Sequence, residues 1–87
     1  MTEETLLEFP CDFPIKAMGR GGEAFPGIVI EIVRRHAPDM DENRIRIRAS
    51  SKGRYQSVTV TIRAENKSQL DNIYQDLTDH DQVVMAL

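Results

Sequence analysis

Residues 43–64 read NRIRIRASSKGRYQSVTVTIRA, and polar and apolar side chains alternate through two runs of this stretch. In the first run, arginines alternate with isoleucine and alanine, and in the second, valine and isoleucine alternate with serine and threonine. A period of two is typical of half-buried strands. The polar link between the runs contains Gly53, which can adopt the positive φ of a tight turn. The stretch therefore predicts a hairpin with one apolar face and one face of arginine, serine and threonine.

A strand and a helix are predicted before the hairpin. Residues 13–18 alternate between apolar and mixed side chains, and the glycines at 19, 21 and 22 break that pattern. Pro26 then suits the first turn of a helix. From Phe25 to His36 apolar side chains recur at helical spacing and form one stripe that ends before Pro38.

A second helix and a last strand are predicted after the hairpin. Asn66 lies three residues before Gln69, the spacing of a capping box, and apolar residues at helical spacing follow. These signals predict a helix over residues 67–78. The polar turn at residues 79–81 leads into an apolar segment, residues 82–87, which predicts a terminal strand.

The order βαββαβ predicts an α+β fold of the ferredoxin-like type. Right-handed crossovers in both βαβ halves give a two-layer sandwich, with an antiparallel sheet in the order 4-1-3-2 and two helices on one face. The second and fourth strands are then the edges of the sheet. Arginines protect the second strand, whereas the fourth is short and apolar and suits pairing with another subunit.

Length and composition predict one domain over residues 1–87, whose polar residues 1–9 form a loosely held arm. The net charge of −3 argues against a general polyanion binder but allows local basic patches. The acidic N-terminus and the lack of a long apolar run predict a cytoplasmic protein with no membrane association. The lone Cys11 is interpreted as a strand-entry residue, and neither a metal nor a cofactor is predicted.

The predicted open face of the sheet is cationic and rich in hydroxyl groups. Its cations are Lys16, Arg46, Arg48 and Arg63. A solvated face is the simplest interpretation, and an anionic ligand, a protein or a nucleic acid is the alternative. The middle strands place Met18, Thr59 and Thr61 where RNA-binding sandwiches carry stacking aromatic side chains. This argues against a sequence-specific RNA reader.

Two loops are further candidate sites. Ser51, Lys52, Gly53 and Arg54 are interpreted as a plain hairpin turn, with capture of an anion as the weaker alternative.

The segment Met18-Gly19-Arg20-Gly21 leads to the start of the first helix, where anions are attracted. This segment is similar to the phosphate cradle of acylphosphatases, and a hydrolase of that type would need Arg20. Glu23 adds negative charge nearby, and no residue has a convincing place as general base, so no catalytic residue is predicted. His36 is predicted to stabilise the end of the first helix.

Three segments resemble the YbeD-like family of small bacterial proteins: residues 13–19, residues 35–38 (RHAP) and, above all, residues 50–60 (SSKGRYQSVTV). The resemblance runs along nearly the whole chain. It implies a ferredoxin-like fold similar to ACT domains, which bind small effectors, often amino acids, at subunit interfaces. It carries no established activity, although a link to lipoate metabolism has been suggested. By topology, the ACT effector site would map to Met18, Gly19 and Gly21, where a flexible, acid-flanked loop favours a zwitterion or an amine.

The sequence therefore predicts a non-enzymatic regulatory or interaction module of ACT-like type. It would bind a small-molecule effector or a partner enzyme and would form a homodimer. The second hypothesis is a nucleic-acid or other polyanion contact through Lys16, Arg46, Arg48 and Arg63. The third is acylphosphatase-like hydrolysis.

Overall fold

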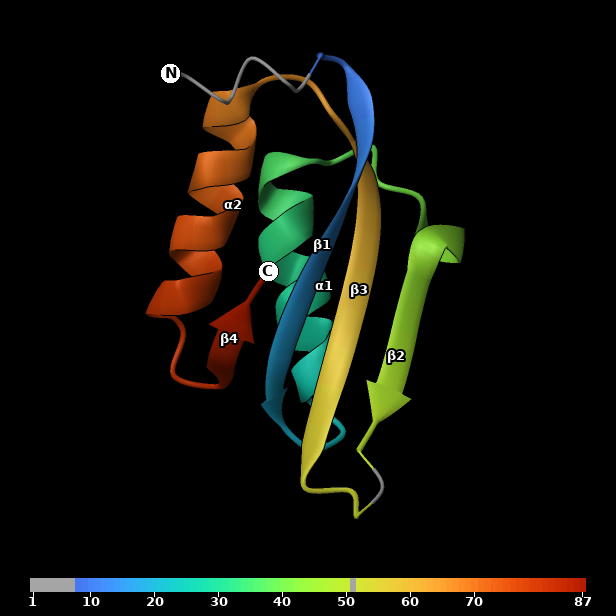
Figure 1. Ribbon diagram of the computed structural model, residues 1–87, viewed down its shortest axis with the longest axis vertical. Coiled ribbons are helices and arrows are strands. Elements are labelled where there is room, and N and C mark those ends of the chain that lie inside the picture. Colours follow the sequence, from blue (N-terminus) through green and yellow to red (C-terminus); the bar gives the residue numbers. More distant parts are fainter. Residues whose placement is uncertain (1–7, 51) are drawn as a thin grey trace.

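The predicted order of strands and helices is the observed one. The computed structural model describes residues 8–50 and 52–87. Its elements are β1 (Cys11–Arg20), α1 (Phe25–His36), the short 3-10 helix η2 (Glu42–Arg44), β2 (Ile45–Ala49), β3 (Tyr55–Ala64), α2 (Lys67–Asp79) and β4 (Val83–Ala86) (Figure 1). The sheet order is β2-β3-β1-β4 and every neighbouring pair is antiparallel. This confirms the ferredoxin-like α+β fold and the predicted order 4-1-3-2.

β1 and β3 form the centre of the sheet and pair along their whole length, from Cys11 opposite Ala64 to Arg20 opposite Tyr55. This register places Ile15 and Ala17 on the same side as Val58 and Val60, and all four are buried. The side chains between them lie on the other face. The alternation read from the sequence is therefore the alternation between the core and the open face.

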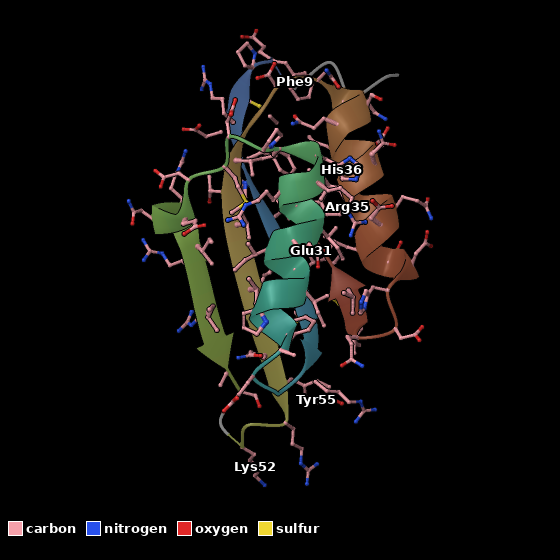
Figure 2. All side chains as sticks on the ribbon, turned by 180° about the vertical axis from the view of Figure 1, so that it is seen from behind. Phe9, Glu31, Arg35, His36, Lys52 and Tyr55 are labelled. Carbon is pink, nitrogen blue, oxygen red and sulfur yellow. The ribbon has the colours of Figure 1, made fainter. Side chains whose placement is uncertain are left out.

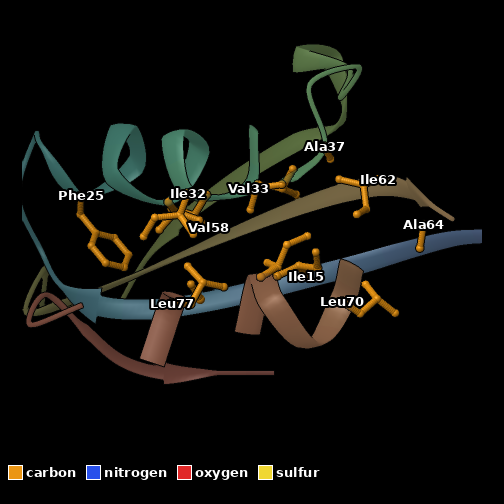
Figure 3. Close-up of a cluster of buried hydrophobic side chains, with 14 residues drawn as sticks. Ile15, Phe25, Ile32, Val33, Ala37, Val58, Ile62, Ala64, Leu70 and Leu77 are labelled. Atoms are coloured by element: carbon orange, nitrogen blue, oxygen red, sulfur yellow. The ribbon is translucent and has the colours of Figure 1, made fainter. Parts of the chain in front are cut away.

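Both helices pack their apolar stripes against the same buried cluster (Figure 3). From α1 the buried residues are Phe25, Val29, Ile32 and Val33, and from α2 they are Leu70, Ile73 and Leu77. Since Ile15, Val58 and Ile62 of the sheet belong to the same cluster, one face of the sheet is covered and the other is left open.

The predicted capping box at α2 is present with one difference. Asn66 Oδ1 accepts from the Gln69 backbone N–H at 2.8 Å, as the spacing predicts. The return bond reaches one residue further back, because Gln69 Oε1 accepts from the N–H of Glu65 at 2.7 Å. Near the middle of α2, the Tyr74 hydroxyl donates to the Leu87 carbonyl at 2.7 Å, and burial raises the pKa of Tyr74.

Several boundaries differ from the prediction. β1 continues through Gly19 to Arg20, because these two residues still pair with Gln56 and Tyr55 of β3. The Phe25 ring and the Gln82 carbonyl approach Gly19 so closely that a Cβ there would overlap both. Gly19 therefore completes a strand that it was expected to break. α2 extends one residue further, to Asp79, and β4 covers Val83–Ala86, although Leu87 still exchanges backbone hydrogen bonds with Lys16.

The predicted N-terminal arm lies largely outside the described residues, which begin at Glu8. Phe9, the first apolar residue described, packs against the edge of the core. Within the described ranges, no helix combines the length and the apolar character needed to cross a membrane.

Candidate functional site

The two loops that the sequence offered as separate sites lie against each other. The Gly21 N–H donates to the Arg54 carbonyl at 2.9 Å. A Cβ on Gly21 would lie 2.5 Å from the Gly53 carbonyl oxygen, so only glycine permits this approach. Gly53 has φ 70°, the positive value predicted for the turn. The β1–α1 loop and the β2–β3 hairpin loop thus form one junction at one end of the molecule (Figure 1).

A pocket of ≈ 300 Å³ opens at this junction. It is called here the loop-junction pocket, and it is lined by Gly21, Gly22, Glu23, Ala49, Gly53, Tyr55 and Gln56. Of the two predicted loop sites, the structure brings Gly21 and Gly53 to its wall.

Other predicted loop residues lie away from the pocket wall. Gly19 is buried beneath Phe25, and Met18 and Arg20 follow the alternation onto the open face. Arg20 is the last residue of β1 and does not line the loop-junction pocket. Ser51 lies outside the described residues. The Gly53 N–H, a candidate anion donor, is already bonded to the Ser50 carbonyl at 2.9 Å.

Gln56 is the pocket residue that the sequence interpretation missed. It lies opposite Gly19 and Ala49, on the core side of the sheet. Its Oε1 is buried and has no hydrogen-bond partner among the described residues. A buried acceptor without a donor costs about 1–3 kcal/mol. The signal was a single polar residue at a core-facing position of the run Gln56, Val58, Val60, Ile62.

The two loops that form the loop-junction pocket carry charges of both signs. Glu23 is the acid in its lining. Lys52 and Arg54 are exposed on the hairpin loop, where Figure 2 shows Lys52 at the tip and Tyr55 further up, at the start of β3. The N-terminus of α1 follows directly, with Ala24 as N-cap, no side-chain capping bond and no acid in the first turn. Among the described residues, no side chain caps the positive end of this helix by a hydrogen bond.

The four predicted cations lie on the open face of the sheet, and their neighbouring residues differ. Lys16 and Arg46 both lie beside Thr59, and Arg48 lies beside Ser57.

Arg63 lies at the far end of that face. Its Nη1 lies 3.6 Å from Asp12 Oδ1, and Arg44 Nη1 lies 3.3 Å from the same atom. The hydrogen bond and charge of Arg44, with a smaller contribution from Arg63, lower the pKa of Asp12 below its ordinary value. Arg63 is therefore partly neutralised within the chain.

His36 stabilises the end of α1 through α2. Its Nε2 lies 2.6 Å from Asp76 Oδ2, and Arg35 Nη1 lies 3.6 Å from the same oxygen (Figure 2 shows both side chains at this end of α1). The His36 carbonyl accepts from Gln69 Nε2 at 2.8 Å. Among residues 8–50 and 52–87, no three His, Cys, Asp or Glu side chains gather in a way that could hold a metal ion.

Comparisons with known proteins extend over the whole fold. Residues 4–87 match the family described as "Protein of unknown function (DUF493)". The UPF0250 protein NE1487 of Nitrosomonas europaea is 49% identical over 87 residues, which cover 100% of both chains. A UPF0250 protein of Neisseria gonorrhoeae is 48% identical over 91 residues, again with both chains fully covered. The names of these relatives state no activity.

A solved structure shows the same fold. The solution structure of protein HP0495 from H. pylori matches with a TM-score of 0.71 at 17% identity, covering 93% of this chain and 85% of that one. The whole-length matches confirm the resemblance to small bacterial proteins that residues 50–60 indicated. The chain belongs to the DUF493 family of small bacterial proteins, which the UPF0250 proteins represent among its relatives.

Proposed function

We propose that this protein is a non-enzymatic regulatory module of ACT-like type that binds a small zwitterionic metabolite in the loop-junction pocket. The observation that carries the proposal is Gln56, which lines a pocket of ≈ 300 Å³ together with Glu23 and whose buried Oε1 has no hydrogen-bond partner among the described residues. An ammonium group donates three hydrogen bonds and accepts none, so it suits an amide oxygen together with a carboxylate. The pocket volume is that of a site for a small ligand.

The surroundings support a negative group at the other end of the ligand. Lys52 and Arg54 are exposed on the hairpin loop, and α1 begins beside the pocket without a capping side chain. Both features favour a carboxylate. Glu23 in the lining would repel a phosphate, which carries more negative charge and offers no ammonium in return. A zwitterion therefore fits better than the substrate of a phosphate hydrolase.

Binding can affect assembly because the pocket adjoins β4 through Gly19. Gly19 pairs with Gln56 on one side and with Val83 of β4 on the other, and the Phe25 ring and the Gln82 carbonyl close over it. β4 is an edge strand whose Val84 and Met85 are exposed. A ligand that holds the two loops together would favour one arrangement of this edge over another. Ligand-dependent pairing of β4 edges would be the regulatory output.

The test is light scattering and calorimetry of the protein with a panel of amino acids, their des-amino analogues and acyl metabolites that include lipoate. We expect a zwitterion to bind and to change the mass in solution, and its des-amino analogue to bind at least about tenfold more weakly. Gln56→Met should abolish binding, whereas Gln75→Met, on the exposed surface of α2, should leave it unchanged. Equal binding of both analogues, or full binding by Gln56→Met, would contradict the proposal.

A further inference from the structure

Charge is segregated between the two sides of this molecule. Among the described residues of the strands, the open face carries five cations and one acid: Lys16, Arg20, Arg46, Arg48, Arg63 and Asp12. The acid is engaged by Arg44 and Arg63. The whole chain has 14 acidic and 11 basic residues, so the basic character of this face does not follow from composition. The face is arranged to meet negative charge.

The open face is also apolar along one side. Met85 lies beside Met18, and Leu87 lies beside Lys16, which places Met18, Met85 and Leu87 together as an apolar strip over β1 and the C-terminal segment. Met85 is 49% exposed and Leu87 61%. On the opposite side, Arg46 and Arg48 form a cationic strip on β2. Ser57 and Thr59 of β3 lie between the two strips.

We propose that the open face docks an amphipathic, acidic α-helix of a partner protein. The cationic strip on β2 and Met18 on β1 are two strand spacings apart, about 10 Å at ~4.8 Å per spacing. An α-helix with side chains is about 10–12 Å across, so one helix lying along the strands contacts both strips. Its apolar stripe would cover the apolar strip, and its carboxylates would face Arg46 and Arg48.

The spacing along β2 supports the same occupant. Arg46 and Arg48 are two residues apart on one strand, which separates them by about 6.8 Å. Carboxylates at i and i+4 of a helix are about 6 Å apart along its axis, so two of them can pair with the two arginines. Arginine also suits carboxylates because its guanidinium can donate two parallel hydrogen bonds.

Two other occupants fit this face less well. A single-stranded nucleic acid would stack its bases on aromatic side chains, but the centre of the face offers Met18, Ser57 and Thr59. The apolar strip also has no counterpart on a phosphate backbone. A second copy of the chain cannot supply the helix from α1 or α2, because the apolar stripes of both are buried in their own core.

The experiment is an NMR titration of the 15N-labelled full chain with a synthetic peptide of about 18 residues, which has a leucine stripe flanked by glutamates. We expect shifts at the backbone amides of Lys16, Met18, Ser57, Thr59 and Met85, and none along the exposed side of α2. Binding should weaken as salt is raised. The same peptide with lysine in place of glutamate should not bind.

The matched variants distinguish docking on the open face from general electrostatic attraction between the peptide and the protein. The double variant Arg46→Glu/Arg48→Glu should weaken binding of the glutamate peptide at least about tenfold. The control Arg34→Glu/Lys67→Glu makes the same change in net charge on the helices and should bind the glutamate peptide normally. Met85→Ser, in the apolar strip, should weaken peptide binding without changing the salt dependence of that binding. The proposal is overturned if the glutamate peptide causes no shifts at millimolar concentration, if the double variant binds normally, or if only polyuridylate binds.

Discussion

The two ends of α1 are held in different ways. At the C-terminal end, the His36 ring is paired with Asp76, its carbonyl accepts from Gln69, and the Ala37 N–H donates to the Val33 carbonyl. At the N-terminal end, Ala24 offers no capping side chain, and the nearby Gln56 Oε1 is buried without a donor among the described residues. Polar groups at the C-terminal end are hydrogen-bonded within the chain, whereas those at the N-terminal end include an acceptor that is unsatisfied among the described residues. The first arrangement stabilises the fold, and the second is where we propose that a ligand binds.

The largest effect is expected at the N-terminal end of α1, where Gly19 lies under the Phe25 ring. Gly19→Leu should lower the free energy of unfolding by roughly 2–3 kcal/mol, because the new side chain must displace both the ring and the Gln82 carbonyl. Urea unfolding followed by circular dichroism measures the change. The control is Gly27→Ala, where a Cβ meets open space in a helix, and stability should rise by about 0.5–1 kcal/mol. Equal tolerance at both glycines would contradict this packing.

The next effect tests the C-terminal end of α1. Gln69→Ala removes the bond that its Nε2 donates to the His36 carbonyl and the bond that its Oε1 accepts from Glu65. We expect a loss of about 1–2 kcal/mol in the free energy of unfolding, since two hydrogen bonds are lost together. Asn66→Ala removes only the N-cap bond and should cost about 1 kcal/mol. A smaller loss for Gln69→Ala than for Asn66→Ala would mean that the bond between the helices contributes nothing.

These features also show which parts of the structure can be read from the sequence. The hairpin, both helix stripes and the bond between Asn66 and Gln69 join residues close along the chain, so periodicity and spacing predicted them. His36 and Asp76 are 40 residues apart, and no local pattern joins them.

The same holds at the loop-junction pocket. The sequence predicted that Gly19 ends β1. Its contact with Phe25 could not be predicted, because that contact arises only when α1 folds back over the sheet. Sequence signals predicted a site near Gly21 and another near Gly53, but the fold was needed to place them on one wall with Gln56.

A smaller effect of opposite sign is expected at Gln56. Gln56→Met keeps the approximate shape of the side chain and removes a buried acceptor that has no donor among the described residues. Stability should rise by about 1 kcal/mol in urea unfolding without ligand. The same change should abolish zwitterion binding, so one substitution would raise stability and remove binding. If Gln56→Met destabilises the free protein, the oxygen has a partner in solution, and the polar groups at both ends of α1 are then satisfied.

The smallest effect is expected away from α1, at the exposed ion cluster of Asp12, Arg44 and Arg63. The Arg44 hydrogen bond and charge, then Arg63, lower the pKa of Asp12 from 3.8, so its contribution to stability is present above that value and is lost as pH falls through the folded-state pKa. Asp12→Asn should therefore flatten the acid limb of stability against pH and change little near neutral pH, where exposed pairs contribute weakly. Urea unfolding from about pH 2 to about pH 7, at low and high salt, measures this dependence of stability on pH.

His36→Gln, which removes the ring that pairs with Asp76, should instead lower stability at neutral pH, because that pair is half-buried. A larger neutral-pH loss for Asp12→Asn than for His36→Gln would mean that the open face, and not the end of α1, holds the stronger polar contacts.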